Sequence, residues 1–181
     1  MKIINTKFSD AFLIEPVYHR DHRGFFVESF SQKWLEQAGV SVHFVQDNHS
    51  LSVERGVLRG LHFQLPPVTQ AKFIRVIHGS VFDVIIDLRR SSETYRQWES
   101  FELSEKNGLM LFIPKGFAHG FCTLEPNTEF MYKVDQYYST EHEGGILWSD
   151  SELNIPWPVE HPVVSERDAK WPQFKDQRLP F

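Results

Sequence analysis

Cysteine is nearly absent from the 181-residue sequence. The single one, Cys122, excludes an intramolecular disulfide and fits a reducing compartment. Long apolar runs are also lacking, so we expect neither a signal peptide nor a membrane partner. There is no basic excess, because 19 Lys and Arg face 24 Asp and Glu, and this balance argues against a nucleic-acid partner. We expect one cytoplasmic domain over residues 1–181.

Short segments rich in aromatic and β-branched residues recur along the chain, and this composition predicts β-strands. The predicted strands cover residues 24–30, 57–64, 71–78, 81–88, 98–103, 109–113, 121–123 and 128–137. The sequence His78-Gly79-Ser80 predicts a tight hairpin, and Asn107-Gly108 predicts a second turn. Many short strands at regular spacing favour an all-β sandwich or barrel.

A helix is predicted at only one interior place. Ser31 is a suitable N-cap for residues 32–38, and Gly39 is a suitable stop. The tail from Pro156 contains two Trp-Pro pairs, so we expect an irregular arm that packs over the barrel.

One motif narrows the fold further. Residues 108–119 have the spacing G-x5-P-x-G-x2-H, which resembles the second signature of the cupin superfamily, whose fold is a jelly-roll (double-stranded β-helix) barrel. In the first cupin signature, G-x5-H-x-H, Gly56 and His62 match, but Gln64 replaces the second histidine and the usual glutamate is missing. Catalytic metal sites usually have three protein ligands, so we expect no metal here.

Residues 57–64 carry Arg59, His62 and Gln64 in an otherwise apolar segment. Strand alternation places His62 and Gln64 on one face. A core histidine bonded to a backbone carbonyl would explain His62 alone. Three polar side chains so close together would be costly to bury without partners, and this cost favours a functional site.

Three further residues have plain structural explanations when each is taken alone. Lys72 could be a solvated strand end, Tyr132 a packed aromatic with its hydroxyl at the rim, and Asp168 an ordinary loop carboxylate. Taken together they indicate a functional site, because the sequence closely resembles the dTDP-4-dehydrorhamnose 3,5-epimerases, metal-free cupins of deoxysugar biosynthesis. The matching blocks are residues 21–28, 45–48, 58–64, 113–121, 131–134, 145–148 and 165–168.

The resemblance implies a role for each of these side chains. It makes His62 the general base, oriented and made more basic by Asp168. It makes Tyr132 the opposing general acid and lets Lys72 stabilise the enolate oxygen. Positions that match binders of the dTDP-sugar substrate are Arg23, Glu28, Gln46, Asn48, Arg59, His119, Glu143 and Arg167. It further implies that no cofactor is needed and that the protein is a homodimer, in which residues 23–30 of each chain complete the partner's site.

Two positions depart from expectation. Arg167 stands where the family usually has lysine, which keeps the charge but changes its geometry. Strict alternation also places Arg59 on the face opposite His62. Either a bulge near Gly60 corrects this, or Arg59 reaches the diphosphate from another direction.

The residue types suit epimerisation beside a ketone. In a 4-keto-6-deoxy sugar, C3 and C5 are both α to the C4 carbonyl, so loss of a proton from either gives an enolate. A histidine titrates near the working pH, so His62 can accept and release a proton. A cation such as Lys72 offsets the charge on the enolate oxygen, and forked donors such as Arg23 and Arg59 suit a diphosphate.

Three other functions remain open at this point. A relative that inverts only C3 or only C5 would carry nearly the same residues. A carbohydrate-binding cupin without catalysis would not need His62, Tyr132, Lys72 and Asp168 together. A metal-dependent oxygenase or isomerase is disfavoured by Gln64 and the missing glutamate.

Overall fold

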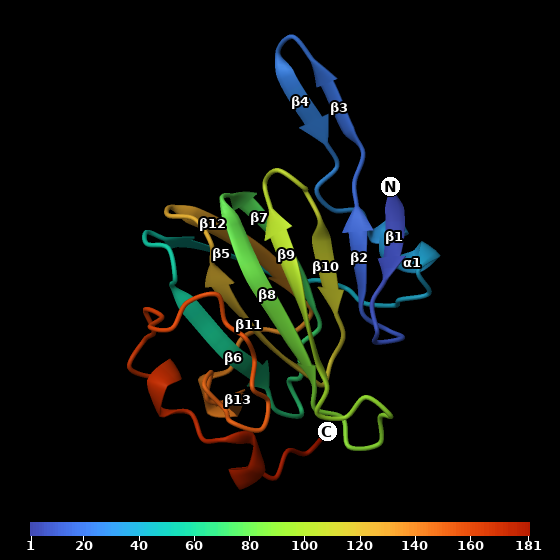
Figure 1. Ribbon diagram of the computed structural model, residues 1–181. Helices are drawn as coiled ribbons and strands as arrows, with labels where there is room; N and C mark the ends of the chain where they lie inside the picture. The colour runs from blue at the N-terminus through green and yellow to red at the C-terminus, as the bar shows by residue number, and fades with distance from the viewer.

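The computed structural model describes residues 1–181 and confirms the predicted all-β class. Two antiparallel sheets face each other (Figure 1). The first has the order β1 (Lys2–Asn5), β2 (Phe12–Glu15), β10 (Met110–Ile113), β7 (Lys72–His78), β12 (Thr128–Val134) and β5 (Gln46–Ser52). The second has the order β13 (Glu143–Gly145), β6 (Leu58–Gln64), β11 (Phe117–Thr123), β8 (Ser80–Asp87) and β9 (Trp98–Ser104).

The interior of the barrel is filled by alternate residues of both sheets. Leu13 and Ile74 from the six-stranded sheet pack in one cluster with Val81 and Phe121 from the five-stranded sheet. On β8, Ile85 also belongs to this cluster, whereas the adjacent Val84 belongs to the cluster on the outer face. This alternation follows from the pleat of a strand, and it decides which polar side chains can reach the space between the sheets.

The turn at residues 78–80 corrects the hairpin prediction. Strands β7 and β8 lie in different sheets and do not pair, so Gly79, with φ at +77°, carries the chain from one sheet to the other. The Asn107-Gly108 turn has the same role between β9 and β10. Turn chemistry was recognised in both places, but it does not show whether the flanking strands pair with each other.

The outer faces of both sheets are covered. Helix α1 (Gln32–Gln37) begins after Ser31 and ends before Gly39, as predicted, and buries Trp34 and Leu35 on the outer face of the six-stranded sheet. The tail covers the five-stranded sheet with Phe174 and with Leu179. This confirms the predicted irregular arm, which contains only the 3₁₀ turns η2 (Asp168–Lys170) and η3 (Phe174–Asp176); a third, η1 (Thr140–His142), precedes β13.

Some strand boundaries differ from the predictions. Strand β11 begins at Phe117, four residues earlier than expected, and β12 ends at Val134. Strands β1, β2, β3, β5 and β13 were not predicted, because they are short or carry polar residues at alternate positions. No helix is long and apolar enough to cross a membrane.

A two-stranded hairpin, β3 (Tyr18–Asp21) and β4 (Gly24–Val27), projects away from the barrel (Figure 1). Its aromatic side chains lie in the open, with Phe25 exposed to 59% and Phe26 to 67%. Aromatic rings of this size are rarely left in solvent without a partner.

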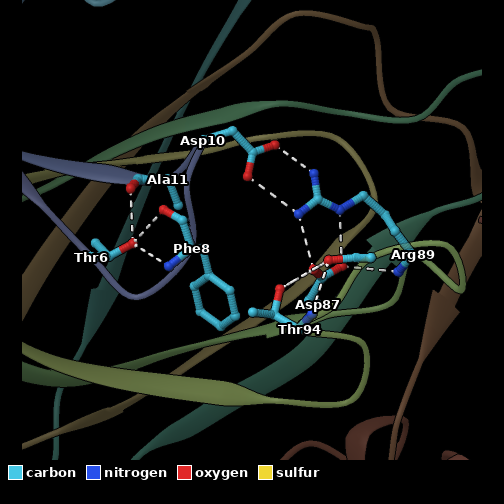
Figure 2. A network of polar contacts seen from close by, with 8 residues as sticks. Thr6, Phe8, Asp10, Ala11, Asp87, Arg89 and Thr94 are labelled. Carbon is cyan, nitrogen blue, oxygen red and sulfur yellow. Dashed lines mark hydrogen bonds and ion pairs between the residues drawn. The ribbon is translucent and has the colours of Figure 1, made fainter.

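A polar network closes the end of β8 (Figure 2). The fully buried carboxylate of Asp87 accepts hydrogen bonds from the Arg89 guanidinium, the Ser92 hydroxyl and the Thr94 hydroxyl. Arg89 also bonds Asp10, which ties the turn after β1 to this end of the barrel. The hydrogen bonds from Arg89, Ser92 and Thr94 lower the pKa of Asp87 although burial opposes them. The carboxylate therefore stays charged and paired.

Candidate active site

A cavity of about 450 Å³ lies between the two sheets. Its polar lining comes from Ser50, Arg59, His62, Lys72, His119, Tyr132, Ser165, Arg167 and Asp168, and its apolar lining from Val57, Leu58, Phe121, Phe130, Val163 and Val164. All four residues predicted to be catalytic are therefore in one space. Three of the eight predicted to bind substrate (Arg59, His119 and Arg167) line it as well.

His62 and Asp168 form the closest polar pair in the cavity. His62 Nε2 lies 2.7 Å from Asp168 Oδ1, and the second carboxylate oxygen accepts the backbone N–H of Gly60 at 3.3 Å. Burial alone would raise the pKa of Asp168, but the hydrogen bond and charge of His62 together with Arg167 lower it. Asp168 is thus a carboxylate of the C-terminal arm that holds the His62 ring.

Tyr132 reaches the cavity from the opposite sheet. It lies on β12 of the six-stranded sheet, whereas His62 lies on β6 of the five-stranded sheet. Burial raises the pKa of the Tyr132 phenol, and the charge of Glu143 adds to this, while Arg59 opposes it. The phenol therefore keeps its proton in neutral solution. Tyr132, which can donate a proton, and His62, which can accept one, therefore line the cavity from opposite sheets.

Lys72 is the one buried lysine or arginine of the chain. It begins β7, next to β12, so its ammonium and the Tyr132 hydroxyl come from the same sheet. Burial lowers the pKa of Lys72 to about 8, and the charges of Asp83 and Glu143 limit that fall. At neutral pH the cavity thus holds a cation that water screens poorly.

His119 is held by a carboxylate that sequence reasoning missed. Its Nε2 lies 2.8 Å from Oδ2 of Asp83, a fully buried residue of β8. Burial lowers the pKa of His119 and raises that of Asp83, and each is opposed by the charge of the other. A lone aspartate inside the apolar run 81–86 was an available signal, because such a charge is costly to bury without a partner.

A bulge in β6 resolves the orientation of Arg59. His119 pairs with His62, and Phe121 pairs with Arg59, so two steps along β11 match three steps along β6. The additional residue brings Arg59 and His62 to the same cavity. Gly60 is required there because its φ is +145° and a Cβ would lie 2.5 Å from the Gly120 Cα.

Glu143 and Arg167 meet at one side of the site. Arg167 Nη1 lies 2.7 Å from Glu143 Oε2, and the same oxygen accepts the hydroxyl of Tyr138 at 2.9 Å. Glu143 is outside the cavity lining but close enough to influence Lys72. Tyr138 was not predicted as a site residue, although its exposed ring follows the predicted strand directly.

Gln46 and Asn48 lie beside each other on β5, the edge strand next to β12. Gln46 Nε2 donates to Asn48 Oδ1 at 2.8 Å, and Gln46 Oε1 accepts the backbone N–H of Tyr138. Neither residue lines the cavity, although Ser50, two residues further along the same strand, does.

Arg23 and Glu28 are not brought to the cavity of their own chain. Arg23 lies at the turn of the projecting hairpin, where it pairs with Asp21 at 2.6 Å. Glu28 follows β4 and lies beside Met1, Val17 and Trp34. Their predicted contacts with the substrate stay a prediction.

Potential metal ligands do not gather in this structure. It contains no group of three or more His, Cys, Asp or Glu side chains arranged to hold an ion. Gln64, which replaces the second histidine of the cupin signature, is buried and accepts the backbone N–H of Ser139 at 3.1 Å. The prediction of metal-independent chemistry stays a prediction.

A family model and the related proteins that match this sequence indicate the same family. A sequence model of the dTDP-4-dehydrorhamnose 3,5-epimerase family matches residues 5–176. The dTDP-4-dehydrorhamnose 3,5-epimerase of Shigella flexneri is 50% identical over 177 residues, which cover 97% of each chain.

Two crystal structures extend the likeness to the fold. The Bacillus anthracis dTDP-4-dehydrorhamnose 3,5-epimerase, with TDP and pyrophosphate bound, has a TM-score of 0.93 and 54% identity, over 95% of this chain and 98% of that one. The Legionella pneumophila 3,5-epimerase, in complex with dTDP-4-keto-L-rhamnose, has a TM-score of 0.91 and 45% identity, over 95% and 92%. The predicted cupin-type barrel is confirmed. With its fold, its cavity and nearly its whole length matched, the chain belongs to the dTDP-4-dehydrorhamnose 3,5-epimerase family.

Proposed function

We propose that the protein epimerises dTDP-4-dehydro-6-deoxy-D-glucose at C3 and C5 to give dTDP-4-dehydro-L-rhamnose, a step of dTDP-L-rhamnose biosynthesis. The observation that carries this proposal is the opposition of His62 and Tyr132 across one cavity, with Lys72 beside them. Inverting a carbon requires a base on one ring face and an acid on the other. A cavity with one such group on each sheet can meet that requirement.

His62 is the base. It removes the proton at C3 or C5, and the C–H electron pair moves into the ring to form the enolate of the C4 ketone. Asp168 accepts the hydrogen bond from the imidazolium that results, and it stabilises that charge without taking the proton. The lowered pKa of Asp168 keeps it a carboxylate throughout.

Tyr132 returns a proton to the opposite face of the same carbon, which completes the inversion. Lys72 supplies positive charge near the oxygen on which the enolate charge develops, and its burial strengthens this interaction. Both reacting groups then exchange protons with solvent before the second centre reacts. Only protons move, so the reaction needs no redox cofactor, and Lys72 offers the positive charge that a metal ion could otherwise supply.

The nucleotide is bound by the remaining matched residues. Arg59 and Arg167 offer forked donors suited to the diphosphate, and Glu143 fixes Arg167 at 2.7 Å. His119 lies at the cavity wall on β11, and Gln46 and Asn48 supply amide groups next to the cavity on β5.

We also propose that the protein acts as a homodimer in which the β3–β4 hairpin of each chain reaches the other chain. The exposed Phe25 and Phe26 support this, since they would be covered by a partner, and Arg23 would then enter the partner's cavity. Mixing Arg23→Ala with His62→Ala protein tests it. Random assortment makes half of the dimers mixed, each with one intact site, so about a quarter of wild-type activity should return.

If the mixture is no more active than its components, Arg23 does not serve the partner's site. A monomer in solution would contradict the homodimer itself. A cytoplasmic location is supported by the single, buried Cys122, which fits a reducing compartment. The net charge of −5 supports the absence of a nucleic-acid partner.

The activity is tested by incubating the purified protein with dTDP-4-dehydro-6-deoxy-D-glucose and following the sugar ring couplings by proton NMR. The proposal expects a product inverted at both C3 and C5. A product inverted at one centre would favour the single-centre relative, and an unchanged substrate would contradict the proposed reaction.

A further inference from the structure

The interior of the barrel contains a buried ionic cluster that extends beyond the His62–Asp168 pair. Asp83 on β8 bonds His119 on β11 directly, and Lys72 on β7 of the facing sheet is near enough for its charge to interact with that of Asp83. Asp83 has no exposed surface, whereas Lys72 and His119 both line the cavity. The carboxylate therefore cannot touch substrate, but both residues near it can.

Asp83 is poorly satisfied for a buried carboxylate. Oδ2 has the hydrogen bond from His119 at 2.8 Å, while Oδ1 is buried and has no hydrogen-bond partner. On the same strand, four residues along, Asp87 is equally buried yet accepts hydrogen bonds from Arg89, Ser92 and Thr94 (Figure 2). A charge buried with one hydrogen bond needs a nearby cation, and Lys72 is the only buried one.

We propose that Asp83 is a positioning residue of the epimerase site, whose carboxylate holds the His119 ring with its proton on Nε2 and keeps Lys72 an ammonium ion. This inference rests on the proposed function. A carboxylate, an ammonium and a neutral imidazole make a cluster with no net charge, which is the least costly arrangement in a buried site. Burial lowers the pKa of His119 and of Lys72, and Asp83 opposes the lowering at both. Burial also raises the pKa of Asp83 itself, and His119 and Lys72 oppose that rise and favour the carboxylate.

The arrangement has a consequence for each neighbour. With Nε2 donating to Asp83, the Nδ1 atom of a neutral His119 is left as a hydrogen-bond acceptor. With Asp83 charged, Lys72 retains its proton in neutral solution and can offset enolate charge. The other charged or titratable groups at this cavity are Glu143 on β13, Arg59 and His62 on β6, Tyr132 on β12, and Arg167 and Asp168 at η2.

The test compares Asp83→Asn with Asp87→Asn, two isosteric changes on the same face of the same strand. Asp83→Asn should lower kcat, because the positive charge of Lys72 is weakened, and should raise KM, because the substrate-binding His119 is no longer held. The combined loss in kcat/KM should be about 10- to 100-fold. Asp87→Asn, measured well below its melting temperature, should retain kcat. Equal kcat in the two variants would overturn the proposal.

A pH profile separates positioning from structural damage. In wild type, kcat/KM should decline through about pH 8 as Lys72 loses its proton. In Asp83→Asn the decline should begin at lower pH, and lowering the pH should recover part of the lost activity. A profile that is merely scaled down, with an unmoved alkaline limb, would overturn the role assigned to the Asp83 charge.

Two NMR measurements need no substrate. Nitrogen-15 spectra of wild type should show His119 protonated at Nε2 and unprotonated at Nδ1, and the Lys72 amine should titrate at lower pH in Asp83→Asn than in wild type. The opposite tautomer, or an unmoved Lys72 titration, would overturn the proposal. Wild type that leaves the sugar unchanged would instead overturn the proposed function.

Discussion

Strand β8 carries two buried carboxylates, Asp83 in its middle and Asp87 at its end, which have different environments. Asp87 is surrounded by Arg89, Ser92 and Thr94, which together satisfy it, and the pKa of this carboxyl is lowered. Asp83 has a single hydrogen bond, an unpartnered oxygen and a raised pKa. In β8 the fully paired charge of Asp87 serves the fold, whereas the incompletely paired charge of Asp83 lies beside two cavity residues, His119 and Lys72, whose protonation it influences.

The pH dependence of stability should have opposite signs at the two carboxylates. At Asp87 the folded pKa is below 3.8, so its stabilisation is present above that value and is lost as the pH falls further. At Asp83 the folded pKa is above 3.8, so its charge costs stability as the pH rises through the raised pKa. Selection for stability alone would not favour Asp83, which agrees with a role in the site.

The largest expected effect is on turnover and comes from His62→Ala. Removing the base should reduce kcat by roughly 10²- to 10⁴-fold, the usual contribution of a positioned acid or base. The fold should persist because the side chain is partly exposed to the cavity. Turnover and a thermal melt check both points, with the exposed, carboxylate-paired His49 changed to Ala as the matched control. Near-wild-type turnover in His62→Ala would end the proposed mechanism.

The next effect is on stability and comes from Asp87→Asn. We expect a loss of about 3 kcal/mol, the lower end for breaking a buried pair, because Arg89 retains Asp10. For a chain of this size the melting temperature should fall by roughly 6–12 °C. Calorimetry of this variant beside Asp83→Asn makes the comparison direct. A larger destabilisation in Asp83→Asn than in Asp87→Asn would reverse the contrast drawn between them.

Tyr132→Phe should reduce turnover less than His62→Ala, by roughly 10- to 100-fold, because water can replace the donor in part. The packed ring remains, so stability should change little. Analysis of the product by NMR should show whether one centre reacts preferentially once the phenol is lost. Full activity at both centres would show that the acid is another group.

The smallest expected effect is the decrease in kcat/KM of the wild-type protein at alkaline pH. Lys72 is charged below its pKa of about 8 and neutral above it, so kcat/KM should decrease roughly tenfold for each pH unit beyond that value. Lys72→Gln should be less active and should lose this alkaline limb. Wild type that keeps its kcat/KM through pH 9.5 would show that the Lys72 charge is not needed.

Three of the four residues predicted to be catalytic, His62, Tyr132 and Asp168, lie in recognisable sequence blocks. Together with Lys72 they line one cavity, and their catalytic roles stay predictions. The side on which Arg59 lies could not be predicted, because a bulge depends on the pairing of β6 with β11 rather than on local composition. The hairpin prediction at residues 78–80 was wrong for a similar reason, since pairing is decided by the whole sheet.

Other features could not be predicted from local sequence patterns. Asp83 was not predicted as a site residue, because it lies within an apolar strand and its partner, His119, is 36 residues away along the chain. Strand β11 was predicted to begin too late because Pro114 and Gly116 indicate a turn, and the strand resumes immediately after it. Arg23 and Glu28 lie outside the cavity of their own chain, so their predicted contacts with the substrate stay predictions.

The most direct test of the mechanism is proton exchange in deuterium oxide, with purified enzyme, a metal chelator and dTDP-4-dehydro-6-deoxy-D-glucose. If His62 and Tyr132 transfer protons through an enolate without a metal, proton NMR should show deuterium entering both C3 and C5. Loss of exchange on chelation, or inversion without deuterium at either carbon, would contradict the metal-free acid–base account.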